Sequence, residues 1–505
     1  MHLKDILKRF FLSAGPVLFL FNFFAGVLFL NEGLFHHDSV VLAQAVEQAY
    51  QTGHLQPSIR GRYGAVIINS LLYLPFFLLG LNADLMLRLS SVLFHALSVC
   101  MLFYFVKAFL ENETKAFFAA FLFSFIPVYF IPNTYGKEHG MSMFFLLLSF
   151  YLVYCGSKKG NLLFLSLSGF FFIFSITVRE SMLITASLYV LLYFSPVITL
   201  RPLKFSLQKE KVSKARLIAW CIPFAISFLT VYCTYLKREF YQAIYVGDFS
   251  DTQFLGLLSS VLPRALADIY TSVPTMLLVF FIIGADILLR QQKAFQALCL
   301  LLWSLLIFYL GNVISYCPRY LDLVFVPICI LAAESLYAIY AQEKLLCYGI
   351  LIYFVMALFN FMYPLLSFRH IYNGEKQFAL YVREKTPENS IVVAIDDAPF
   401  MEYYGHRATS VIPVNAPESM EKFMKQLKDS MKRGIPVYMM ESAFYMMEAA
   451  FIYDSKYEFT KKFFTEFSVN VVGEKLSEDY HRPELSLNTY MQKLFKLELK
   501  REGQQ

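Results

Sequence analysis

The chain has 505 residues, of which 57% are hydrophobic and only 16% are charged, and its mean hydropathy is +0.52. This composition excludes a water-soluble single domain and a disordered chain, because the apolar residues exceed what a globular surface tolerates. The excess lies in runs of about 16 to 22 apolar residues, the length that crosses a bilayer core. The net charge of +6 is too small, and too concentrated in loops between these runs, to indicate nucleic acid as a partner.

Charge divides the chain into two parts. Residues 1–365 hold 25 basic and 18 acidic residues, or 12% of the segment, whereas residues 366–505 hold 19 and 20, or 28%. The contrast predicts a membrane domain over 1–365 and a water-soluble domain over 366–505. All eight cysteines lie in the first part without a CxxC spacing, so neither a disulfide framework nor a zinc cluster is indicated.

Eleven apolar segments are predicted to cross the membrane. In chain order they are 10–30, 85–106, 116–132, 141–155, 161–178, 182–200, 217–236, 272–289, 294–311, 320–339 and 345–365. The first follows a basic start and is interpreted as an uncleaved signal anchor, since no small-residue cleavage site follows it. A further apolar stretch, 64–80, is predicted to lie at the interface without crossing.

Lysine and arginine positions predict the orientation. With 64–80 at the interface, 16 basic residues in short loops fall on one side and nine on the other. Because the richer side is cytoplasmic, the chain is predicted to be a multi-pass protein of the cell inner (plasma) membrane, with a cytoplasmic N-terminus and an extracytoplasmic C-terminal domain. The outer side then receives two long loops, 31–84 and about 237–271. Residues 38–53 of the first loop have the apolar spacing of an amphipathic surface helix.

The C-terminal part alternates strand-like and helix-like segments. Strands are predicted at 390–396, 409–414, 436–440 and 468–473, with helices near 398–405, 417–433 and 442–466. This order predicts a small parallel-type sheet with helices packed against it. The fold class is therefore an α-helical polytopic membrane protein with a C-terminal extracytoplasmic α/β domain. No glycine-rich loop opens these helices, so nucleotide binding is not indicated.

Nine basic residues fall on the predicted outer side, where the positive-inside rule disfavours them. They are Arg60, Arg62, Arg88, Lys137, Arg179, Lys237, Arg238, Arg264 and Arg319. An anionic ligand such as a lipid phosphate would compensate for this placement, because a guanidinium holds phosphate in bidentate fashion. The alternative is that each residue neutralises a nearby carboxylate or reaches the lipid headgroups.

Acidic residues also interrupt the outer ends of the predicted spans. Asp38, Glu138 and Glu180 follow the first, third and fifth spans, and a carboxylate beside apolar surface suits a general base. Each has a structural alternative: Asp38 as a helix cap, Glu138 as the partner of Lys137, and Glu180 as the partner of Arg179. No metal site is predicted, because adjacent histidines such as His36 and His37 are expected to point in different directions.

The order of several motifs resembles a known family. These motifs are LFHHDSVVLAQAV, GRYGAVIINSLLYLPFFLLG, LMLRLSSVLFHALSVCMLFYFV, IPVYFIPNTYGKEHGMSMFFLLLSFYLVY, VRE at 178–180, YCPRYLDLVFVPICILAAESL and NSIVVAIDDAPFMEYYG. Together they are similar to the bacterial glycosyltransferase C-fold enzymes, of the dolichyl-phosphate-mannose protein mannosyltransferase and lipid A aminoarabinose transferase type. The resemblance covers nearly the whole chain, and its specificity comes from the order of the motifs.

The resemblance implies transfer of a sugar from a polyprenyl-phosphate donor to a lipid, glycan or protein acceptor on the outer face of the membrane. Asp38 matches the acidic residue of the first outer loop and would deprotonate the acceptor hydroxyl, while Glu138 or His139 would orient the acceptor or the sugar. The basic residues would bind the donor phosphate, and the set of expected substrate-binding residues is Arg60, Arg62, Arg179, Arg264, Arg319 and Tyr320.

The chain departs from the family pattern at three places. Asp38 is followed by Ser39 where relatives often have glutamate, Gly61-Arg62-Tyr63 replaces an acidic-basic-proline motif, and His139 stands where an aspartate is common. Two other functions stay open: a ligase or polymerase acting on lipid-linked oligosaccharides, and a transporter or flippase. Transporters typically carry inverted repeats, and the sequence shows no internal repeat.

Overall fold

The computed structural model describes residues 14–56, 62–196, 198–201, 204–207, 214–231, 274–314, 321–395, 397–413, 417–444, 461–481 and 486–500. The chain divides into two compact units. The first comprises Met1–Leu30 and Ala45–Ser367, and the second comprises Asn31–Gln44 and Phe368–Gln505. A short segment from the early part of the chain therefore belongs with the C-terminal part. The predicted signal anchor begins outside the described residues.

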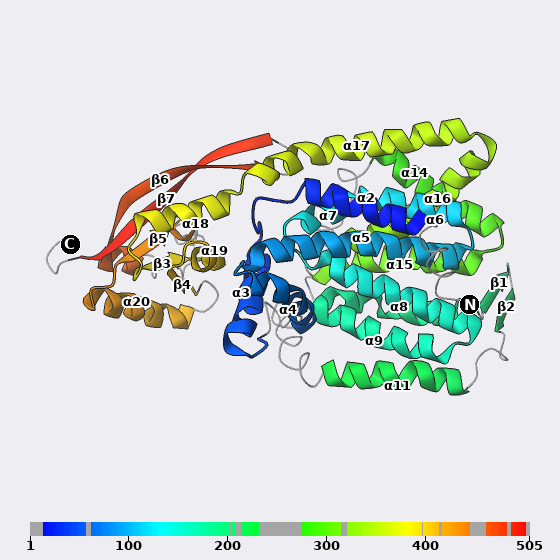
Figure 1. Ribbon diagram of the computed structural model, residues 1–505, viewed down its shortest axis with the longest axis horizontal. Coiled ribbons are helices and arrows are strands. Elements are labelled where there is room, and N and C mark those ends of the chain that lie inside the picture. Colours follow the sequence, from blue (N-terminus) through cyan, green and yellow to red (C-terminus); the bar gives the residue numbers. More distant parts are fainter. Residues whose placement is uncertain are drawn as a thin grey trace. The chain divides into compact units, whose positions relative to one another are not determined.

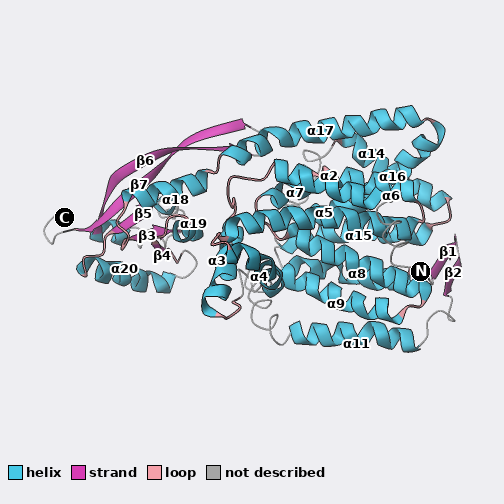
Figure 2. Ribbon diagram, in the orientation of Figure 1, coloured by secondary structure: helices cyan, strands magenta, loops and turns pink. Residues whose placement is uncertain are grey.

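The first unit is helical (Figures 1 and 2). Its helices are α2 (Ala14–Leu28), α4 (Tyr63–Leu78), α5 (Ala83–Leu110), α6 (Glu113–Ser124), α7 (Pro127–Phe130), α8 (His139–Lys159), α9 (Leu162–Val178), α10 (Ala186–Phe194), α11 (Lys214–Val231), α14 (Thr275–Arg290), α15 (Ala294–Ile314), α16 (Asp322–Gln342) and α17 (Lys344–Ile371), with 3-10 turns η2 (Ile131–Thr134) and η3 (Glu180–Thr185). Each of the eleven predicted membrane segments overlaps at least one of these helices, and the last residues of α17 belong to the second unit. The expected surface helix is α3 (His37–Thr52), which begins in the second unit and ends in the first.

Several of these helices have the length and composition of membrane spans. Among the described residues, Ala83–Leu110, His139–Lys159, Asp322–Gln342 and the stretch Lys344–Lys385 are long and apolar enough to cross a bilayer. The count is five if α6 and the following helix Pro127–Thr134 form one bent span. Shorter apolar helices, α2, α4 and α9 among them, accompany these. The number of crossings in the whole chain stays a prediction.

A sharp bend interrupts the third predicted span. The axis turns by 68° between α6 and the helix Pro127–Thr134. Pro127 supplies the physical reason, because its ring disfavours a helical conformation at the residue before it and it has no N–H to donate. Ile126 accordingly adopts an extended conformation, with ψ at 116°. The continuous helix expected over 116–132 is thus two helices joined at an angle.

The sixth predicted span is also shorter than expected. Helix α10 ends just before Pro196, and residues 198–201 and 204–207 form an antiparallel pair of strands, β1 (Ile198–Arg201) and β2 (Lys204–Leu207). A proline cannot continue the helical hydrogen-bond pattern, which explains the end of the helix. The first strand overlaps the end of the predicted span 182–200, and the sequence predicted no strand at either position.

Close helix packing defines the core of the first unit. At Gly284 of α14, a Cβ atom would lie 1.8 Å from the backbone oxygen of Leu331 in α16. No side chain fits in that space, so only glycine allows these two helices to approach so closely. Buried leucine and aromatic side chains fill the surrounding core, including Phe103, Phe150 and Trp303.

The second unit contains a mixed five-stranded sheet in the order β4-β3-β5-β7-β6. Its elements are α18 (Gly374–Lys385), β3 (Ile391–Ala394), α19 (Ala398–Tyr403), β4 (Ala408–Val411), α20 (Pro417–Lys432), β5 (Val437–Met440), β6 (Phe467–His481) and β7 (Ser486–Leu499). β3 pairs in parallel with β4 and β5, as the sequence predicted, whereas β7 pairs antiparallel with β5 and β6. The expectation of a parallel-type sheet is therefore confirmed for β3, β4 and β5 and wrong for the strand predicted at 468–473, which lies in β6. Much of the helix predicted over 442–466 lies outside the described residues.

The early segment 31–44 is hydrogen-bonded to the C-terminal part of the second unit. The backbone N–H of Leu34 donates to the Tyr404 hydroxyl at 3.0 Å, and the Asn373 side-chain amide donates to the Leu34 carbonyl at 3.0 Å. Lys376 Nζ lies 2.8 Å from a carboxylate oxygen of Glu32. These contacts fix the backbone immediately before α3.

Candidate functional site

The first unit buries a group of ionic side chains where several helices end. Arg62 precedes α4, Glu138 precedes α8, His139 opens α8, Arg179 follows α9 and Asp322 opens α16. All five are at most 5% exposed. Glu138, Arg179 and Asp322 also suit the helix dipole, since anions are favoured near a helix N-terminus and cations near a C-terminus.

Arg62 binds two carboxylates. Its Nη1 donates to Glu138 Oε1 at 2.5 Å, while Nε and Nη2 donate to the two oxygens of Glu180 at 3.1 and 3.2 Å. The second contact is a bidentate pair, the arrangement for which a planar guanidinium is best suited. The two carboxylates also offset the unfavourable position of a cation at the N-terminal end of α4.

Arg179, His139 and Asp322 form a second ionic group. Arg179 Nη1 donates to Asp322 Oδ2 at 2.7 Å, and His139 Nδ1 lies 2.9 Å from the same oxygen and 3.1 Å from Arg179 Nη1. The other oxygen of Asp322 accepts the backbone N–H of Leu323 at 2.8 Å. Asp322 is fully buried. A buried carboxylate is tolerated because a cation and hydrogen-bond donors surround it.

Lys137 is a third buried cation, with 2% of its surface exposed. Its backbone carbonyl accepts a hydrogen bond from the Ser91 hydroxyl. With Arg62 and Arg179 it gives three cations, which formally balance the three carboxylates Glu138, Glu180 and Asp322. The alternative partners proposed from sequence were neighbours along the chain. The structure joins Glu138 and Glu180 to Arg62, which comes from a different part of the chain.

A buried polar network holds the start of α8, which carries Glu138 and His139. Asn133 Oδ1 accepts the backbone N–H of Gly140 at 2.8 Å, and Asn133 Nδ2 lies 3.4 Å from the His95 ring. A Cβ atom at Gly140 would approach the backbone nitrogen of His95 to 2.6 Å. Gly140 therefore allows α8 to begin against α5, which places the first turn of α8 beside the ionic groups.

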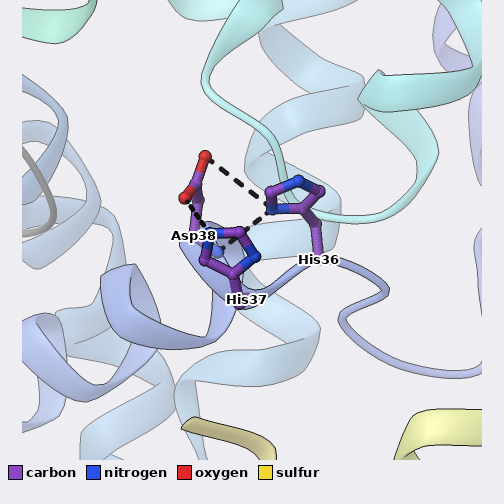
Figure 3. Close-up of side chains that lie close together, drawn as sticks. All are labelled: His36, His37 and Asp38. Carbon is purple, nitrogen blue, oxygen red and sulfur yellow. Dashed lines mark hydrogen bonds and ion pairs between the residues drawn. The ribbon is translucent and has the colours of Figure 1, made fainter. Parts of the chain in front are cut away.

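Asp38 lies in the second unit with two histidines (Figure 3). Its carboxylate oxygens lie 2.9 Å from His37 Nε2 and 3.7 Å from His36 Nδ1. The two imidazole rings are 4.3 Å apart and inclined by 32°, so the expectation that they diverge is wrong. They converge because His36 precedes α3 and is not constrained by helical geometry. Asp38 is the second residue of α3, not the residue before it where a capping side chain is found.

The structure describes only part of the predicted site. It brings together Arg62, Glu138, His139 and Arg179, and it describes Asp38 within the other unit. The predicted substrate-binding residues Arg60, Arg264, Arg319 and Tyr320 lie outside the described residues.

Asp322 was not among the predicted site residues. Its signal in the sequence is a single carboxylate at the start of an apolar span, three residues after Arg319. An ionisable residue at that position is a functional candidate in its own right. It was missed because its partners, Arg179 and His139, are far away in the sequence.

Comparison with solved structures identifies the fold. One similar structure is an oligosaccharyltransferase of Archaeoglobus fulgidus in complex with zinc and sulfate. The alignment covers 94% of this chain and 72% of the oligosaccharyltransferase chain, with 12% sequence identity and a TM-score of 0.57. The oligosaccharyltransferase AglB of the same organism, in complex with an inhibitory peptide and a dolichol-phosphate, matches 96% and 74% at 12% identity, with a TM-score of 0.55. ArnT of Cupriavidus metallidurans, bound to undecaprenyl phosphate, matches 95% and 97% at 12% identity, with a TM-score of 0.54.

These likenesses confirm the glycosyltransferase C fold that the sequence motifs indicated. No protein-family model matches the chain, and no curated protein matches its sequence. At 12% identity the likeness concerns the fold, so the chemistry has to be argued from the residues of this chain.

Proposed function

We propose that this chain is a membrane glycosyltransferase that moves a sugar from a polyprenyl-phosphate donor to a lipid, glycan or protein acceptor on the outer face of the membrane. The observation that carries the proposal is the buried ionic cluster at the helix ends of a glycosyltransferase C fold. Charges inside an apolar helical body are costly, and such residues commonly mark a substrate site. Structures of this fold hold dolichol-phosphate or undecaprenyl phosphate, which supports the same class of donor here.

The donor phosphate is the leaving group in this reaction. When the bond between the anomeric carbon and the phosphate oxygen breaks, that oxygen keeps the electron pair and the phosphate gains one negative charge. Arg62 and Arg179 would stabilise this charge, because their carboxylate partners hold the guanidinium groups in fixed orientations. Glu138 and His139, beside these arginines, would orient the sugar or the acceptor.

The acceptor hydroxyl has to lose a proton as it attacks the anomeric carbon. Asp38 would take this proton as the general base, since its carboxylate is buried and lies next to His37. Its place after the first helix is also where the resembling enzymes carry an acidic residue. The products are the glycosylated acceptor, polyprenyl phosphate and a protonated Asp38.

A related candidate is a transferase of lipid-linked oligosaccharides, and the likeness to two oligosaccharyltransferase structures favours it as the second possibility. A transporter is less well supported. Transporters place their ionisable residues near the middle of broken spans, whereas the ionic groups described above lie at helix ends.

Donor binding by the purified full chain tests the proposal. Undecaprenyl phosphate should bind to the chain in native mass spectrometry. Arg179→Ala should weaken this binding more than Arg179→Lys, because lysine keeps the positive charge and loses only the bidentate geometry of the guanidinium. Arg88→Lys is the matched control, since Arg88 pairs with Asp84 of its own helix at 2.5 Å. If the wild type and Arg179→Ala bound undecaprenyl phosphate equally well, Arg179 would have no role in donor recognition.

A cellular comparison identifies the transferred group. Outer-surface glycolipids and glycoproteins would be analysed by mass spectrometry in cells with and without the protein. A sugar that is present only when the protein is made supports the proposed transferase and names its product. Identical profiles, together with no binding of undecaprenyl phosphate, would contradict the function.

A further inference from the structure

The side chains of His36, His37 and Asp38 form a donor group that transfer chemistry does not require (Figure 3). One ligand atom from each residue can be chosen so that all three lie within 4.8 Å of one another. Two imidazole nitrogens and a carboxylate oxygen are the ligand types that bind Zn²⁺ and related divalent ions, and three protein ligands leave one coordination position open.

The spacing of these atoms is close to that of a tetrahedral site. Metal–ligand bonds of about 2.0 to 2.2 Å at tetrahedral angles place the ligand atoms about 3.3 to 3.6 Å from one another. His37 Nε2 lies 2.9 Å from Asp38 Oδ1, and His36 Nδ1 lies 3.7 Å from Asp38 Oδ2. A rotation of the carboxylate that turns one oxygen toward both imidazoles would bring all three residues to a shared ion.

Hydrogen bonding indicates which nitrogen of His36 is available as a ligand. The backbone N–H of Asp38 donates to His36 Nδ1 at 3.2 Å, so Nδ1 is the unprotonated nitrogen in this arrangement. A metal ion needs the same tautomer and would take over that lone pair. The displaced N–H lies in the first turn of α3, where backbone N–H groups have no partner inside the helix.

The backbone of this segment is fixed before any ion binds. The His36 carbonyl accepts the N–H groups of Ser39 and Val40, and Leu34 is tied by hydrogen bonds to the C-terminal part of its unit. The side chains of His36 and His37 are 26% and 36% exposed, so solvent and ions reach them. The segment therefore presents three ligands from a rigid base to an accessible face.

We propose that His36, His37 and Asp38 bind one divalent transition-metal ion of the Zn²⁺ class. One oxygen of Asp38 would then bind the ion together with one ring nitrogen of each histidine. An ion in this position competes with the proton that Asp38 takes up in the proposed reaction, so the site is inhibitory. Binding of the ion itself does not depend on the proposed transfer reaction.

The test uses the purified full chain in detergent and Zn²⁺ as the probe. Isothermal titration is expected to show one Zn²⁺ per chain, and Co²⁺ should give the absorption bands of a tetrahedral site. His36→Ala and His37→Ala should each weaken Zn²⁺ binding at least as much as the roughly 10- to 100-fold loss seen when an outer-shell partner is removed. His54→Ala is the matched control, because His54 is an exposed histidine just beyond the end of α3.

A second measurement uses the wild-type chain alone and so does not depend on the folding of any variant. Diethyl pyrocarbonate modifies accessible histidines, and mass spectrometry locates the modified positions. Zn²⁺ is expected to protect His36 and His37 while His54 remains reactive. The absence of a one-to-one titration, or equal modification of all three histidines with and without Zn²⁺, would overturn the proposal.

Discussion

The guanidinium of Arg179 and the carboxylate of Asp322 are joined at 2.7 Å although the residues are 143 positions apart in the sequence. Arg179 lies at the end of α9 and Asp322 at the start of α16, and both are buried. The ion pair therefore fixes two helix ends to each other. It also aligns one arginine of the proposed donor site.

Breaking this pair should destabilise the first unit. Arg179→Ala leaves the Asp322 carboxylate buried without its main cation, and losses of about 3 to 5 kcal/mol are typical of such a change. The double variant Arg179→Ala/Asp322→Ala should lose less than the sum of the two single variants, because it leaves neither charge unpaired. Unfolding of the purified chain in a denaturant series measures the coupling. Additive losses would show that the pair contributes no interaction energy.

Asp38→Asn separates proton transfer from structure. The amide keeps the shape of the side chain and cannot accept the proton, so the transfer rate should fall by a factor on the order of 100 or more while donor binding is retained. Glu32→Gln is the control, since Glu32 is a carboxylate of the same segment that pairs with Lys376. Single-turnover transfer measures the effect. A normally active Asn variant would exclude Asp38 as the base and direct attention to Glu138.

Zinc should inhibit transfer if the metal site and the base share Asp38. At a Zn²⁺ concentration that saturates the site, the carboxylate is coordinated and the rate should fall at least about a hundredfold, the low end of the contribution of a general base. Adding EDTA should restore the rate. Full activity with the site saturated would separate the two proposals, leaving the metal site intact and excluding Asp38 as the base.

Gly284 provides a test of the packing between α14 and α16. Gly284→Ala places a Cβ atom 1.8 Å from the Leu331 oxygen, so the helices must separate, and overpacking of this kind costs about 1 to 3 kcal/mol or more. Gly349→Ala in α17 is the matched control, because its Cβ would meet no atom within 4 Å. Thermal unfolding in detergent compares the two. Equal melting temperatures would show that the helix contact is looser than described.

The membrane orientation is tested with reporter fusions. A reporter after residue 375 should be active only outside the cytoplasm, and one near residue 208 only inside it. The reason is the 16-to-9 division of basic residues between the two predicted sides. Activity of both reporters on the same side of the membrane would refute the eleven-span arrangement.

Local patterns in the sequence predicted most helices and the parallel strands of the sheet. Apolar run length placed the membrane helices, and turn residues separated β3, β4 and β5, because both signals act over a few residues. β7 was missed because its residues include strong helix formers such as lysine, leucine and glutamate. A register shift between Val471 and Gly473 also interrupts the alternation that marks β6.

The partners of the ionic residues could not be predicted in this way. Arg62 was selected because it is a cation on the predicted outer side, yet its partners Glu138 and Glu180 are 76 and 118 residues away. Such contacts depend on which helices pack together, and a single sequence carries no direct signal for that. Asp322 was missed for the same reason.

The hydrogen bond between Asn373 and Leu34 joins residues 339 positions apart, and β7 lies inside the sheet, between β5 and β6. The ribosome makes residues 31–44 long before their partners exist, and β5 has no partner on one side until residues 486–499 have been synthesised. The second unit therefore cannot complete its fold while the chain is still being inserted. The segment that carries Asp38 therefore lacks its hydrogen-bond partners until residues 373–404 have been synthesised.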